Sequence, residues 1–97
     1  MDACIDSYLL HLRLERNLSP HTVTSYARDL QRLVHFLAKR ARPDSFARAD
    51  IERFLAWLRD SEGLSARSAA RTLSAVRGFC KFLVRERVRT DDPSELI

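Results

Sequence analysis

The sequence has little of what disordered, membrane-spanning or disulfide-held proteins contain. Its 97 residues include two glycines, three prolines and two cysteines, and no stretch is of low complexity. Nothing approaches the roughly 20 consecutive apolar residues that a transmembrane helix needs. The first residues, MDACIDSYLL, include acids and differ from a signal peptide or an Arg-rich transit peptide. We therefore expect one folded, cytoplasmic domain with no membrane partner.

The residues that carry common enzyme chemistry are absent or out of context. Cys4 and Cys80 lie far apart without CxxC spacing, so we expect two buried, free thiols. The three histidines show no HExxH or Cys/His spacing, and no glycine-rich phosphate loop exists. Tyr8 and Tyr26 fall on apolar stripes, which favours packing over nucleophilic chemistry. The sequence predicts no metal, no cofactor, no small-molecule substrate and no catalytic residue.

Acidic residues are almost missing from one segment, which concentrates the positive charge. Residues 1–63 hold ten Lys/Arg and nine Asp/Glu, whereas residues 64–90 hold seven Lys/Arg and one Asp/Glu. Residues 91–97 hold three acids, and the whole chain carries a net charge of +4. Such asymmetry indicates an anionic partner, most often nucleic acid, although a solvated helix face gives the same bulk numbers.

Four segments place apolar residues at helical spacing, and no alternating β pattern competes with them. We expect helices over about residues 4–16, 20–40, 50–62 and 64–87. Ser19 before Pro20 is a favourable N-cap for the second helix, and Asp50 is the candidate N-cap of the third. Gly63 suits a left-handed cap after the third helix. Residues 91–97 are typical of a boundary or linker.

The chain also contains an internal sequence repeat of two copies. Shifted by 46 residues, LSPHTVTSYARDLQRLVHFL (18–37) aligns without a gap on LSARSAARTLSAVRGFCKFL (64–83). Two copies are too few for a solenoid. The repeat instead predicts an all-α domain of two helix hairpins, each pairing a short helix with a long one.

The faces opposite the apolar stripes of the two long helices differ in character. In the second helix this face carries hydroxyl, imidazole and guanidinium groups, and in the fourth it is mostly cationic with Gly78 in its middle. No acid occurs between Leu64 and Arg85 to balance it, and small residues separate the cations. Arginine suits phosphate or guanine, so this stripe favours duplex DNA as the partner. We expect Arg28–Asp29 and Glu15–Arg16 to be surface ion pairs.

Three segments together resemble a known family. ERNLSPHTVTSYARDL fits the pattern ERxLSxxTxxxYxxDL, GLSARSAARTLSAVRGFCKFL fits GLSxRSxAxxLSAxRxFxxFL, and DPSELI fits (D/N)PxExI. In this order they are similar to the N-terminal core-binding domain of tyrosine site-specific recombinases, the Xer-type recombinases and phage integrases, and cover nearly the whole chain. Cys80 departs from the pattern, since an aromatic residue is common there.

The resemblance implies an all-α, SAM-like fold of four to five short helices packed as two roughly crossed hairpins. It implies that residues 1–90 form the DNA-binding domain, and that residues 91–97 begin a linker to an absent catalytic domain. The chain would then clamp duplex DNA during recombination or integration without being an enzyme by itself. Leu10 and Leu14, which lie off the apolar stripe of the first helix, would meet other protomers in a tetrameric synapse.

The candidate DNA-binding residues come from the resemblance, the helix faces and the caps: Thr22, Ser25, Arg28, Arg32, Ser65, Arg67, Ser68, Arg71, Ser74, Arg77 and Lys81. Two alternatives remain open from the residues alone. A helical protein–protein module of the SAM or death-domain type would present the same stripe to an acidic partner. A small standalone regulator of transcription would bind DNA without any catalytic domain.

Overall fold

The computed structural model describes residues 1–97 and contains four α-helices and no strand. The helices are α1 (Asp2–Leu14), α2 (Pro20–Leu37), α3 (Arg48–Asp60) and α4 (Ala66–Arg85), with a short 3-10 turn, η1 (Ala38–Arg40), after α2. The predicted all-α class is therefore confirmed. The boundaries differ from the expected ones by about two residues, because local capping rather than apolar periodicity ends each helix.

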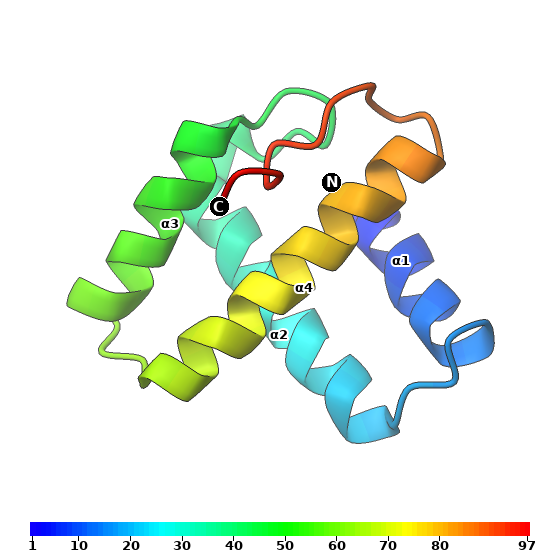
Figure 1. Ribbon diagram of the computed structural model, residues 1–97, viewed down its shortest axis with the longest axis horizontal. Coiled ribbons are helices and arrows are strands. Elements are labelled where there is room, and N and C mark those ends of the chain that lie inside the picture. The colour runs from blue at the N-terminus through cyan, green and yellow to red at the C-terminus, as the bar shows by residue number, and fades with distance from the viewer.

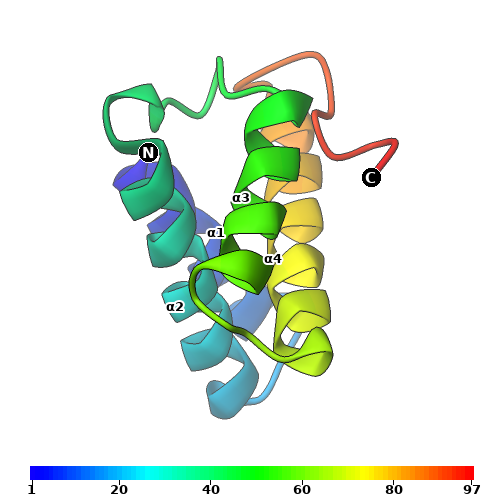
Figure 2. The ribbon, with the colours of Figure 1, turned by 90° about the vertical axis from the view of Figure 1, so that its left-hand side faces the viewer.

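The helices form two crossed hairpins. Helix α1 pairs with α2, α3 pairs with α4, and α4 runs across the front of α2 in Figure 1. In the view turned by 90°, α3 and α4 stand side by side (Figure 2). The crossing of the two long helices therefore lies at the centre of the molecule, with a short helix on either side of it.

The core is built from one apolar stripe on each helix. Burial of these side chains supplies the main driving force for packing the two hairpins together. The hydrophobic helix residues with at most 3% of their surface exposed are Ile5, Tyr8 and Leu12 of α1, Leu30 and Leu33 of α2, Ile51, Phe54 and Leu58 of α3, and Ala75, Val76, Phe79, Cys80 and Leu83 of α4. Both cysteines are free thiols, as expected, although Cys4 is half-buried rather than buried.

The start of α3 corrects one sequence prediction. Ala47, not Asp50, occupies the N-cap position, and Asp50 lies within the first turn. Its carboxylate accepts a hydrogen bond from the Ala47 backbone N–H at 2.8 Å and pairs with Arg40 and Arg53. An acid in the first turn also interacts favourably with the helix dipole, which explains why the sequence signal was misplaced by three residues.

The end of α3 agrees with the sequence. Gly63 has a φ of +63°, the left-handed conformation that glycine adopts without strain. The backbone N–H of Leu64 donates to the carbonyl of Leu58 at 3.0 Å and closes the helix end. The chain can therefore reverse within a few residues and begin α4 beside α3.

The last residues pack on the helical body. Arg89, whose side chain is 5% exposed, donates to the carbonyls of Pro43 and Phe46 at 3.1 and 2.8 Å and lies over the Phe46 ring. Its guanidinium also pairs with Asp91. These contacts fix the direction in which the chain leaves the domain, and the assignment of residues 91–97 to a linker stays a prediction. None of the helices combines the length and the apolar character that crossing a bilayer requires.

Candidate nucleic-acid interface

The two long helices begin with the same capping chemistry. The Ser19 hydroxyl accepts from the backbone N–H of Thr22 at 3.2 Å, and the Ser65 hydroxyl accepts from that of Ser68 at 3.1 Å. Neither first turn contains an acid. Each helix start therefore presents the positive end of the helix dipole together with exposed or half-buried hydroxyl groups. Thr22, Ser65 and Ser68 of the predicted site lie at these two starts.

A buried carboxylate joins the long helices where they cross, and it corrects the predicted Arg28–Asp29 surface pair. Asp29 is fully buried and faces α4 instead of pairing with Arg28. Its oxygens accept two hydrogen bonds from Arg71, each 2.9 Å, and one of 2.9 Å from the Thr72 hydroxyl. A further bond of 3.2 Å comes from Arg32. The site residues Arg32 and Arg71 are thus brought together by an acid that the sequence analysis had placed in solvent.

The contact with Asp29 changes the electrostatics of Arg71. The hydrogen bonds from the guanidinium to the carboxylate raise the pKa of Arg71 above its usual value, so the group stays charged. Its charge is nevertheless partly offset by Asp29, which pairs with Arg32 as well. Arg71 is therefore not a free cation of the predicted stripe, although 39% of its side chain remains exposed.

Of the other basic residues of α4, Arg85 pairs with Glu15 and Glu86, and the remaining three have no such partner. Arg67, Arg77 and Lys81 are exposed and carry charges that no carboxylate balances. Since α4 has no acid before its C-terminal cap, these side chains form a surface of one sign. Such a surface attracts a polyanion and repels an acid-poor or basic protein.

Part of this surface lines a groove of about 280 Å³ between α4, α2 and the C-terminal end of α1. Arg16 and Tyr26 also line the groove but are outside the predicted site. The sequence places Tyr26 on the apolar stripe of α2, and Arg16 lies beyond the end of α1. Arg16 directly follows Glu15 at the end of α1, where the chain turns at Asn17 with a φ of +51°. Also in the groove are Ser74, Arg77 and Lys81 from the predicted site.

Gly78 forms part of the floor of this groove rather than an open point of the stripe. A Cβ on Gly78 would overlap the hydroxyl oxygen of Tyr8 and stand 3.2 Å from its Cζ. The absence of a Cβ at Gly78 therefore allows two elements to approach closely. The close approach is used inside the domain, where α1 packs against α4.

Two predicted arginines of α2 line a different hollow. Arg28 and Arg32 border it together with His35, with Trp57 of α3 and with the acid Glu62. Ser25 lies half-buried one turn earlier on the same helix. The predicted site therefore has two basic arms, Arg77 and Lys81 in the groove beside α1 and Arg28 and Arg32 in the hollow beside α3, and the two share no lining residue. Its side chains are hydrogen-bond donors and cations, a set that suits binding of phosphate and base edges.

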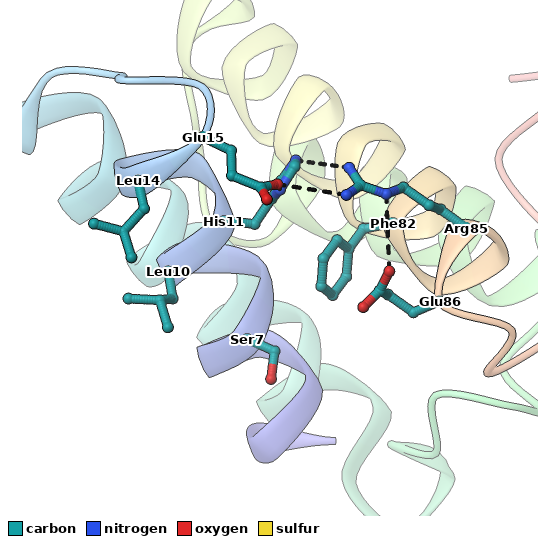
Figure 3. Close-up of a pocket in the computed structure, with 8 residues that line it drawn as sticks. All are labelled: Ser7, Leu10, His11, Leu14, Glu15, Phe82, Arg85 and Glu86. Carbon is teal, nitrogen blue, oxygen red and sulfur yellow. Dashed lines mark hydrogen bonds and ion pairs between the residues drawn. The ribbon is translucent and has the colours of Figure 1, made fainter.

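A second surface feature lies between α1 and α4, away from these arms. Leu10 and Leu14 are 51% and 68% exposed and point away from the helix pair in Figure 3. Beside them Glu15 accepts hydrogen bonds from His11 and Arg85, instead of forming the predicted pair with Arg16. These two bonds, that from His11 first, lower the pKa of Glu15.

Comparison with known proteins agrees with this geometry and confirms the resemblance stated from the sequence. Residues 5–87 match the family model described as phage integrase, N-terminal SAM-like domain. The chain is 43% identical over 96 residues to the tyrosine recombinase XerC of Pseudomonas syringae pv. syringae. This alignment covers 97% of this chain and 32% of the relative. It is 40% identical over 99 residues to the tyrosine recombinase XerD of Staphylococcus saprophyticus. This alignment covers 100% of this chain and 33% of the relative.

The chain spans about a third of the length of the curated relatives that it matches. The family model, in contrast, covers most of the chain, from within α1 to just beyond α4. The match therefore includes both hairpins and both arms of the candidate interface. The chain belongs to the family of phage integrase N-terminal SAM-like domains.

Proposed function

We propose that this chain binds duplex DNA as the core-binding domain of an Xer-type tyrosine recombinase and contributes no catalytic residue itself. The observation that carries the proposal is the unbalanced charge of Arg67, Arg77 and Lys81 along the exposed side of α4. A single helix fits the major groove of duplex DNA, which is about 12 Å wide. The crossing of α2 over α4 supplies a second helix start that can face phosphates beside that groove.

The proposed contacts divide into two kinds. Phosphate contacts supply most of the affinity and fix the register of the protein on the duplex, whereas base contacts supply specificity. Arg67, Arg77 and Lys81 are the phosphate contacts on this account, because their charge is available. Three neutralised phosphates correspond to a slope of about −2.7 in a plot of log K against log salt concentration. This chain alone therefore binds weakly, as half of a clamp.

A titration with duplex DNA over a salt series tests the proposal. We expect the affinity to fall steeply between about 50 and 200 mM salt, and each of Arg77→Ala and Lys81→Ala to make the slope shallower by about 0.9. Arg59→Ala is the matched control, because Arg59 is an exposed arginine of α3 that pairs with Asp60. No duplex binding at low salt would contradict the proposal and favour the protein–protein alternative, with an acidic partner for the same stripe.

We further infer that Leu10 and Leu14 contact a second protomer when several copies assemble on DNA in a tetrameric synapse. Exposed leucines on neighbouring turns of one helix are a small apolar patch of the kind found at protein interfaces. On a duplex with two adjacent sites, Leu14→Ser should reduce the cooperativity between two copies and leave binding to a single site unchanged. Leu96→Ser is the control, since Leu96 is 74% exposed in the tail. Equal cooperativity in all three proteins would refute this contact.

A further inference from the structure

The contact between Asp29 and Arg71 has a geometry that leaves one edge of the guanidinium free. Asp29 Oδ2 accepts from Arg71 Nε, and Asp29 Oδ1 accepts from Arg71 Nη2, each at 2.9 Å. This is the side-on arrangement of an arginine and a carboxylate, with two parallel bonds. An arginine has five N–H donors, so three donors remain after these two are used.

The remaining donors are arranged for one particular acceptor pattern. One hydrogen on Nη1 and one on Nη2 point in parallel away from the side chain, so the end-on fork of the guanidinium is intact. The Arg71 side chain as a whole is 39% exposed, so it is not sealed inside the domain. Two neighbouring acceptors in one plane, such as O6 and N7 of guanine, match this fork.

The same contact fixes the orientation of the arginine. Asp29 is fully buried, and its Oδ1 also accepts from the Thr72 hydroxyl at 2.9 Å and from Arg32 at 3.2 Å. The backbone carbonyl of Ser68 lies 3.0 Å from the same Thr72 oxygen and is a second acceptor for its single hydrogen. A carboxylate that is held from two helices cannot follow a moving side chain, so Arg71 is held in place before any ligand arrives. Such preorganisation reduces the entropy lost on binding.

Charge separates Arg71 from the other basic residues of α4. Because Asp29, which also pairs with Arg32, offsets part of its charge, Arg71 gains less from a phosphate than Arg67, Arg77 or Lys81 does, and the carboxylate repels a phosphate nearby. A base edge carries no net charge, so this repulsion does not apply to it. The helix therefore presents free cations for the backbone of DNA and one rigid, ion-paired fork for a base.

We propose that Asp29 is a positioning residue that fixes Arg71 as the reader of a guanine in the major groove, an inference that rests on the proposed DNA binding. Arg71 is then a specificity-determining residue, and its role differs from that of the neighbouring cations on the same helix. Arg32 donates to the same carboxylate oxygen from the other side and helps to hold it. Readout by an arginine fork discriminates against the wrong base pair by about 5- to 150-fold.

Selection from a pool of duplexes randomised over about 20 base pairs tests this assignment whatever the target sequence is. The 97-residue chain is incubated with the pool at low salt, and bound duplexes are sequenced over several rounds. We expect one position to be enriched in guanine with the wild-type chain. Arg71→Lys keeps the charge but loses the fork, so guanine at that position should fall to its background frequency while other preferences persist. Arg59→Lys is the control, because Arg59 is an exposed arginine of α3 outside the candidate interface, and it should keep the guanine.

Asp29→Asn tests the positioning role itself. It keeps the size of the side chain but removes its charge, which frees the charge of Arg71. We expect the guanine preference to weaken while affinity for random duplex rises and its salt dependence becomes steeper. If Asp29 had only a structural role, Asp29→Asn would lower the stability of the fold. The molecules that still fold would then keep the base preference and the salt dependence of DNA binding of the wild type. Circular dichroism establishes folding, and if Asp29→Asn does not fold, Arg71→Lys decides the assignment.

The outcomes separate the inference from the function on which it rests. The inference is overturned if Arg71→Lys selects the same guanine as the wild type. It is also overturned if the duplexes selected by the wild type contain no enriched guanine. In both cases the proposed DNA binding stands. Retention of duplexes without any sequence enrichment also overturns the inference and leaves a phosphate-binding role. Failure of the wild-type chain to retain any duplex overturns the proposed function and the inference with it.

Discussion

Replacing Gly78 by alanine should separate α1 from α4 and destabilise the domain. Gly78 lies in the middle of α4, where a Cβ would overlap the Tyr8 hydroxyl oxygen and stand 3.2 Å from its Cζ. Two aromatic rings restrict the Tyr8 ring, whose centroid is 5.7 Å from that of Phe79 and 5.4 Å from that of Phe82. The added methyl group must therefore displace the Tyr8 side chain, or α1 together with it.

The magnitude follows from two opposing effects. Alanine is favoured over glycine in a helix interior by about 1 kcal/mol. Overpacking a core typically costs about 1–3 kcal/mol, and an outright overlap with a packed ring belongs near the upper end. We expect Gly78→Ala to lower the free energy of unfolding by about 1–2 kcal/mol, which corresponds to a fall of about 4–16 °C in the melting temperature.

A double-mutant cycle identifies the cause. Tyr8→Phe removes the overlapping oxygen, so Gly78→Ala should be close to neutral in that background, with a coupling of about 1–2 kcal/mol. Urea denaturation of the four proteins measures both values. A Gly78→Ala protein that is more stable than the wild type, or that loses the same free energy with and without the Tyr8 hydroxyl, would refute the proposed packing of α1 on α4.

Three further predictions concern the caps, the tail and the buried thiol. Ser65→Ala should cost about 1 kcal/mol in urea denaturation because α4 loses its N-cap, and an unchanged midpoint would exclude that cap. Arg89→Ala should cost about 1–3 kcal/mol and speed hydrogen exchange in residues 91–97, since the carbonyls of Pro43 and Phe46 lose their donor. Unchanged exchange would contradict the anchoring role. Burial raises the pKa of Cys80 from its ordinary value of 9.0 to about 12, so the unfolded chain releases this proton first and the stability of the fold should fall as the pH rises above 9. Cys80→Ala should reduce this fall, and equal alkaline loss in both proteins would contradict the cause.

The features that sequence predicts well are those that depend on neighbours along the chain. Ser19 and Ser65 mark the starts of α2 and α4 because a cap bonds a backbone N–H three residues on. Gly63 marks the end of α3 because its conformation is a property of the residue itself. The apolar stripes predict the core for the same reason, since helical periodicity is local.

The features that sequence missed depend on partners far along the chain. Asp29 contacts Arg71 and Thr72, 42 and 43 residues away, whereas the sequence suggested the adjacent Arg28. A signal was present, because Asp29 lies beside Leu30 on the apolar side of α2, and a charged residue in that position needs a buried partner. Gly78 gave a similar signal, since a glycine inside a helix carries a cost that a close contact explains.

The central claim is that duplex DNA binds where α2 crosses α4, and mapping of backbone amide shifts by NMR on the 97-residue chain tests it most directly. On addition of a short duplex at low salt, we expect the largest shifts in the first halves of α2 and α4 and along the exposed side of α4 as far as Lys81. The indole signal of Trp57, beside the Arg28 arm, should shift less than these amides. Shifts confined to α3, or to the part of α1 around Leu10 and Leu14, would contradict the claim.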